Sequence, residues 1–224
     1  MGPRFANTAL NVLTFVCSLT AAVVVVDVLW KRDNASAAAG ELVPTSVKDW
    51  RSYASEGHRS GSRIAPVTVT VFSDFECPFC RVAARDIRDI RGAYGGRLAV
   101  VYRHYPLGFH PHARAAALAS ECAGRQAAFD AYADRLFAIQ DSLGLIPWTA
   151  IARRAGVSDI ERFQACMRDS SGAKAIRQDI IAAKRLGVSG TPAVLVNHQL
   201  FAGSPGKAVL QRYVDAALKE ASKH

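Results

Sequence analysis

The sequence predicts an α/β fold with a helical insertion, preceded by a single N-terminal transmembrane helix. Three observations support this prediction. A strand–helix–strand pattern covers residues 66–102. Helical patterns then dominate residues 107–186, and a hairpin with a final helix closes the chain. Before all of these, residues 7–26 are mostly apolar and carry no charged side chain.

The composition is that of a packed protein. Of 224 residues, 50% are hydrophobic and 21% are charged, which excludes disorder for most of the chain. Lys and Arg total 28 against 19 Asp and Glu, a formal net charge of +9. These basic residues are scattered and form no patch with interleaved aromatic side chains, so no nucleic-acid partner is predicted. Five cysteines are too few for a disulfide-dense scaffold.

Residues 1–32 are interpreted as an N-terminal membrane anchor or a signal peptide. The apolar stretch 7–26 reaches the ~20 residues that a helix needs to cross a bilayer, and Trp30 suits the interface. A cleaved signal peptide is the alternative, because residues 35–39 offer small-x-small cleavage sites. The stretch exceeds the usual signal-peptide core of ~7–15 residues, which favours the anchor. Cys17 is expected simply to line this span.

Residues 33–65 are expected to form a linker and leading segment. The Ala-rich stretch 33–45 has the small side chains of a linker. Residues 47–55, with Trp50, could form a short helix that docks on the domain, and residues 57–62 (GHRSGS) predict a loop.

The main domain is expected over residues 66–222. Alternating Val and Thr after Pro66 predict a strand, a helix follows Cys77-Pro78 to about Arg91, and residues 98–102 predict a second strand. This βαβ unit indicates an α/β sheet. The helical insertion at about 107–186 and the C-terminal part have these expected elements: helices over 111–122, 126–140, 148–154, 160–167 and 174–186, a hairpin of strands 193–196 and 199–201, and a helix over 207–218.

The candidate reactive group is Cys77-Pro78-Phe79-Cys80, placed between a strand and the start of a helix. Two intervening residues on a first helical turn allow the two sulfurs to bond, and Pro78 suits the first helical position. Free amides and the positive end of the helix dipole stabilise a thiolate at Cys77, so its pKa should lie below the free value of about 8.5.

Other uses of this motif fit the sequence poorly. A zinc site needs further ligands at similar spacing, but Cys122 and Cys166 are isolated, so no metal is predicted. Haem attachment needs a histidine where Arg81 stands. A dithiol redox pair is therefore the preferred interpretation.

Several polar residues near the motif have two interpretations each. His104, His110 and His112 could form a substrate or metal site, but loop and helix-cap roles are preferred. Glu76 either tunes the adjacent cysteines or is a solvated loop acid. A run of basic residues is expected to be a solvated helix face: Arg81, Arg85 and Arg88.

Together, VTVTVFSDFECPFC and the downstream GVSGTPAVLVNHQLFAG resemble the DsbA-like thioredoxin-fold thiol:disulfide oxidoreductases, in their membrane-anchored branch. The resemblance covers residues 66–218. It implies a thioredoxin-like fold, a cis Thr191–Pro192 peptide, and catalytic roles for Cys77, Cys80 and Pro192. It also implies substrate contacts by Thr191, Pro78 and Phe79. Thr before this proline also occurs among isomerases, and Phe79 replaces the histidine of the archetypal oxidase.

The other two cysteines outside the apolar segment are Cys122 and Cys166. If Cys77 pairs with Cys80, they remain as a possible second pair, and the family branch often has a bridge in this region. The alternative is two free buried cysteines, which are common in protein cores.

The expected function is thiol–disulfide exchange with extracytoplasmic client proteins, most simply as a dithiol oxidase without a cofactor. Alternatives are a disulfide isomerase or reductase, and a non-catalytic module that binds clients. A membrane redox partner is expected to reset the enzyme. If Cys122 and Cys166 form a structural disulfide, one apolar span before this domain indicates a single-pass cell-membrane protein with its catalytic domain outside the cytoplasm, on the periplasmic or cell-surface side.

Overall fold

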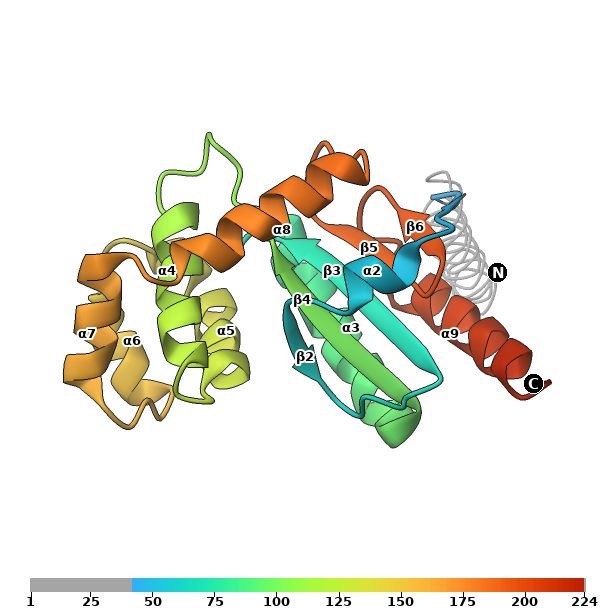
Figure 1. Cartoon of the computed structure of the whole chain (residues 1–224), viewed down its shortest axis with the longest axis horizontal. Helices are drawn as coiled ribbons and strands as arrows, with labels where there is room; N and C mark the ends of the chain where they lie inside the picture. Colours follow the sequence, from blue (N-terminus) through green and yellow to red (C-terminus); the bar gives the residue numbers. More distant parts are fainter. Residues whose placement is uncertain (1–41, 224) are drawn as a thin grey trace, which may run out of the picture. The chain divides into compact units, whose positions relative to one another are not determined.

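The computed structural model describes residues 42–223. Within them lies a six-stranded mixed sheet in the order β1-β6-β5-β3-β4-β2 (Figure 1). The strands are β1 (Thr45–Ser46), β2 (His58–Ser60), β3 (Val67–Ser73), β4 (Leu98–His104), β5 (Ala193–Val196) and β6 (Gln199–Phe201). The helices are α2 (Trp50–Ala54), α3 (Pro78–Tyr94), α4 (Ala113–Gly124), α5 (Phe129–Ala138), α6 (Trp148–Arg154), α7 (Ile160–Asp169), α8 (Ala173–Arg185) and α9 (Lys207–Ala221), with short 3₁₀ turns η1 (Gly95–Arg97) and η2 (Gln140–Ser142).

The predicted βαβ unit is present. Strands β3 and β4 run parallel and are joined by α3, whereas the other pairings in the sheet are antiparallel. The hairpin of β5 and β6 turns at Asn197, which adopts a positive φ of 48°. The helices α4 to α8 lie between β4 and β5 in the chain, so the predicted α/β fold with a helical insertion is confirmed.

Strand β3 is buried along its whole length because helices cover both faces of the sheet. Val69 and Val71 share a core with residues of α3 and α9, such as Ile87 and Val214. Phe72 points to the opposite face, where it packs in a smaller cluster with residues of α8 and β5. This two-sided burial holds the end of β3, and the residues that follow it, in one position.

The loop predicted over residues 57–62 is wrong in part, since His58–Ser60 form the edge strand β2. Its backbone lies very close to β4: a Cβ at Gly57, where φ is +95°, would stand 2.5 Å from the Tyr102 carbonyl oxygen. Glycine therefore permits this pairing, and the strand depends on β4 rather than on β-forming side chains. Both β1 and β2 precede residue 66, so the leading segment contributes two strands to the sheet.

The helix predicted over residues 126–140 is shorter in the structure. It begins at Phe129, because Ala127 has a positive φ of 60° that interrupts helical geometry. It ends at Ala138, and the 3₁₀ turn η2 follows. This early end positions Gln140 outside the helix, where its side chain can reach the loop before α3.

The predicted membrane span over residues 7–26, with Cys17, lies outside the described residues. Among residues 42–223, every helix is too short or too polar to traverse a bilayer.

Candidate active site

The two cysteines of the motif meet the loop before β5 at the carboxyl end of β3. Phe72 of β3 pairs with Ala193 of β5, so Pro192 lies beside the point where β3 ends. The Thr191–Pro192 peptide is cis. The Cys77 thiol donates a hydrogen bond to the carbonyl oxygen of Thr191 at 3.3 Å. Residues separated by more than a hundred positions in the chain thus form one site.

Cys77 is the residue that caps the N-terminus of α3. Its backbone is extended, with φ −77° and ψ 121°, and Pro78 takes the first helical position. The side chain is 4% exposed. A hydrogen bond from Cys80 lowers the pKa of the Cys77 thiol from 9.0 to about 5; burial opposes this change, and Thr191 and the backbone amides of the first turn add to it. Cys77 is therefore a thiolate at neutral pH when the pair is reduced.

Cys80 has the opposite character. Its side chain is fully buried, and burial raises the pKa of its thiol well above the usual range. The backbone N–H of Asp74 donates to its sulfur at 3.4 Å. Both cysteines are free thiols in the structure. The pair therefore combines a thiolate, Cys77, with a buried protonated thiol that can resolve a mixed disulfide.

The residues expected to contact substrate border this pair and differ in exposure. Phe79 is 69% exposed, and Pro78 is also exposed. Thr191 is half-buried. Pro192 is buried. An exposed aromatic ring beside a reactive sulfur offers apolar contact to an approaching chain.

Two buried polar residues hold the loop before α3, and the sequence analysis assigned a role to neither. Gln140 donates from Nε2 to the carbonyl oxygens of Phe75 at 2.7 Å and of Cys77 at 2.9 Å. The carboxylate of Asp74 accepts from the backbone of Glu76 and Leu107. Asp74 stands three residues before Cys77 and could have been singled out there. Gln140 lies in the insertion, and nothing in its sequence surroundings indicates this contact.

The polar residues around the motif serve mostly as structural links. Glu76 accepts a hydrogen bond from the backbone N–H of His112 at 2.7 Å and so ties the motif to the start of α4. Glu76 is therefore not simply a solvated loop acid, which was one of its two interpretations. His110 lies in a loop and bonds the Asp74 carboxylate, and His112 caps α4, as the preferred interpretation has it. His104 is different: it is the buried last residue of β4.

The basic face of α3 is solvated, as expected, and forms ion pairs. Arg81 pairs with Asp141 at 3.0 Å, and Arg88 pairs with Asp134. All of these side chains are at least 41% exposed, so each pair adds little to stability.

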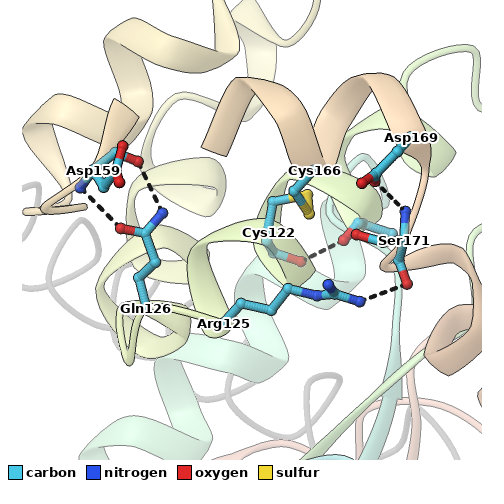
Figure 2. Close-up of a disulfide and its surroundings, with 9 residues drawn as sticks. Cys122, Arg125, Gln126, Asp159, Cys166, Asp169 and Ser171 are labelled. Atoms are coloured by element: carbon cyan, nitrogen blue, oxygen red, sulfur yellow. Dashed lines mark hydrogen bonds between the residues drawn. A yellow bond between two sulfur atoms is a disulfide. The ribbon is translucent and has the colours of Figure 1, made fainter. Parts of the chain in front are cut away.

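A disulfide joins Cys122 of α4 to Cys166 of α7, and Figure 2 shows it between these two helices. The two residues are separated by 44 positions in the sequence. Near the bridge, the Arg125 guanidinium donates to the carbonyl oxygen of Ser171 at 2.7 Å, so a second link restrains the turn after α7 (Figure 2). The bridge closes a loop inside the helical insertion and lies apart from the motif in the chain.

A profile of the family described as Thioredoxin matches residues 54–216, most of the chain. The chain belongs to the thioredoxin family. The family match begins at residue 54 and therefore includes β2, which agrees with a sheet that has strands before residue 66. Among curated proteins, the Na(+)/H(+) antiporter NhaA 3 of Salinispora tropica is 39% identical over 168 residues, which are 72% of this chain and 26% of that protein. The chain thus spans about a quarter of the length of the curated relatives it matches.

Solved structures share the fold of this chain. A thioredoxin-like oxidoreductase from Silicibacter pomeroyi has a TM-score of 0.62 at 29% identity, covering 72% of this chain and 92% of that one. The thiol-disulfide exchange protein alpha-DsbA2 from Wolbachia pipientis has a TM-score of 0.62 at 24% identity, covering 75% and 90%. The predicted resemblance to the DsbA-like thioredoxin-fold proteins is confirmed.

Proposed function

We propose that this thioredoxin-family protein is a dithiol oxidase that transfers the Cys77–Cys80 disulfide to client proteins outside the cytoplasm. The observation that carries the proposal is the asymmetry of the pair: the pKa of Cys77 is lowered to about 5, whereas burial raises that of Cys80. A stabilised Cys77 thiolate favours the reduced enzyme, so its disulfide is readily given away.

The proposed exchange has two steps. A client thiolate attacks Cys77 in the disulfide, the Cys77–Cys80 bond breaks, and Cys80 leaves and takes up a proton. A second client thiolate then attacks the client sulfur of the mixed disulfide, and Cys77 leaves as a thiolate. The client loses two electrons and gains a disulfide, and the enzyme ends with both cysteines reduced. The second step benefits most from the low pKa of Cys77, because a weakly basic thiolate leaves faster.

Pro192 and Thr191 are proposed to bind the extended client chain beside Cys77, with Pro78 and Phe79 on the other side of the sulfur. The contact between Cys77 and the Thr191 carbonyl supports this role for the loop. The 69% exposure of Phe79 supports an apolar contact with the client.

The location is proposed to be the outer side of a cell membrane, with residues 7–26 as a single-pass anchor and a membrane redox partner that reoxidises the pair. Two observations support an oxidising compartment: the Cys122–Cys166 disulfide, and the similarity to proteins named for thiol-disulfide exchange. A reporter enzyme that is active only after export, fused after His224, should be active. Activity of a reporter that works only in the cytoplasm would reverse the topology.

The reduction potential of Cys77–Cys80 tests the direction of exchange. A pKa of about 5 for Cys77 lies between the roughly 7 of thioredoxin and the roughly 3.5 of DsbA, so the potential should lie between their values of about −270 and −120 mV. A potential in the less negative half of this range supports an oxidase. A value near −270 mV would favour a reductase, and Thr191 before the cis proline makes an isomerase the second candidate.

A further inference from the structure

A second cluster of chemically reactive side chains lies away from the motif. His58 of β2, His104 of β4 and Glu121 of α4 converge, and their potential ligand atoms all lie within 4.8 Å of one another. Nε2 of His58 is 2.7 Å from Oε1 of Glu121, and Nε2 of His104 is 3.0 Å from the same oxygen. Three separate elements thus direct two imidazole nitrogens and one carboxylate to a single point.

The cluster is built into the core and not spread on the surface. The side chain of His104 is 1% exposed, that of Glu121 10%, and that of His58 25%. The ring of His58 stacks on Phe129 with centroids 3.5 Å apart, which fixes its plane. A Cβ at Gly124 would stand 2.9 Å from Cε1 of His58, so the absence of a side chain there leaves room for the ring.

The hydrogen bonds inside the cluster show where its protons lie. Both Nε2 atoms contact Oε1 of Glu121, and a carboxylate oxygen accepts, so each Nε2 donates. Nδ1 of His104 is buried and has no partner among residues 42–223. The proton of His104 can therefore move from Nε2 to this free Nδ1, which leaves the Nε2 lone pair for an ion.

A cavity of about 460 Å³ borders His58 and Glu121 and supplies an entry path. Its lining includes the carboxylates of Glu56, Glu121 and Asp179 against one guanidinium, that of Arg103. Arg103 is itself bonded to Asp179 at 2.5 Å. The cavity therefore favours a cation and can hold water beside the cluster.

We propose that His58, His104 and Glu121 bind one divalent transition-metal ion, with Zn²⁺ as the ion that fits best. Two histidines and one glutamate are a known zinc ligand set in which water fills the fourth position, and the cavity provides that water. Each imidazole binds through the Nε2 lone pair, so the proton on Nε2 moves to Nδ1, and a doubly protonated ring releases one proton to solvent. The ion would replace the two hydrogen bonds to Glu121 and link the edge strand β2 to α4.

Cobalt absorption tests the site directly. The full chain is purified in detergent with its disulfides oxidised, so that Cys77 and Cys80 are excluded as ligands, and Co²⁺ is added. We expect d–d absorption bands between about 500 and 650 nm that saturate at one Co²⁺ per chain and disappear when Zn²⁺ is added, since both ions adopt similar tetrahedral sites. No saturable absorption with the oxidised protein would overturn the proposal.

Matched variants locate the ion. Glu121→Gln and His58→Ala should each weaken Co²⁺ binding. Loss of a residue that only contacts a ligand costs about 10–100-fold in metal affinity, and loss of a ligand itself should cost more. His198→Ala is the control, because His198 bonds Gln199 in the β5–β6 hairpin region and lies outside the cluster. Equal affinity in wild type and Glu121→Gln would place the ion elsewhere and refute the proposal.

A thermal measurement covers the case in which a variant is poorly folded. Zn²⁺ should raise the melting temperature of the oxidised wild-type chain and of His198→Ala, because a ligand that binds only the folded state stabilises it. The rise should be absent in Glu121→Gln, which preserves the shape of the side chain. An unchanged melting temperature in wild type at millimolar Zn²⁺ would contradict the proposal.

Discussion

Replacing Gln140 with leucine should loosen the loop that carries Cys77. The side chain of Gln140 is 6% exposed and donates two hydrogen bonds, to the carbonyl oxygens of Phe75 and Cys77. The Cys77 carbonyl keeps other donors, the backbone N–H groups of Cys80 and Arg81. It therefore loses one bond worth about 1 kcal/mol, whereas the Phe75 carbonyl is left unpaired at a cost of about 1–3 kcal/mol.

The sum for Gln140→Leu is a loss of about 2–4 kcal/mol in the free energy of unfolding, measured by urea titration of the reduced protein. The matched control is Gln126→Leu, which removes one hydrogen bond donated to the Asp159 carbonyl and two accepted from Ser158 and the Asp159 backbone. All three are exposed, so water can replace them and the change should cost under about 1 kcal/mol. Gln140→Leu should also raise the pKa of Cys77, because the backbone amides of the first helical turn are held less firmly. Equal unfolding free energies for the two variants, with an unchanged Cys77 pKa, would refute this account of the loop.

Three further predictions concern the cysteines and their surroundings. Replacing Cys122 and Cys166 together with alanine should lower the free energy of unfolding by about 4 kcal/mol, since the bridge closes a loop between residues 44 positions apart; denaturant titration with the Cys77–Cys80 disulfide intact measures this, and a loss under about 1 kcal/mol would contradict it. Thr191→Val should raise the pKa of Cys77 above about 5, because the threonine side chain helps to lower it; titration of thiolate absorbance near 240 nm detects the change, and an unchanged midpoint would exclude a role for the hydroxyl. The reduced wild type should be more stable to unfolding than the reduced Cys77→Ser variant, and this difference should shrink as the pH falls from about 9 to about 5. The reason is that across this range the thiol of unfolded Cys77 takes up a proton whereas folded Cys77 does not. Urea titrations of both proteins measure the difference, which would stay constant with pH if Cys77 were an ordinary thiol.

The parts of the fold that depend on local pattern were predictable. The alternation of valine and threonine in Val67–Ser73 and the placement of Cys77-Pro78 at a helix start led to the βαβ unit. The resemblance of the second motif led to the cis peptide before Pro192, which the structure contains.

The parts that depend on contacts distant in sequence were not predictable. Strand β2 has no strand-like composition and exists because glycines let it approach β4. Gln140 reaches Phe75 across 65 positions, and His58 reaches Glu121 across 63. No local signal marks such partners, since their roles arise only when the insertion packs against the sheet.

The central claim is that Cys77 reacts as a thiolate while Cys80 stays protonated and shielded. The direct measurement is the rate of alkylation of the fully reduced protein between pH 3 and 10, with the labelled residue identified by peptide mapping. The account predicts that Cys77 alone is labelled at first and that its rate has a midpoint near pH 5. A midpoint near 9.0, or labelling of Cys80 as fast as Cys77, would contradict it.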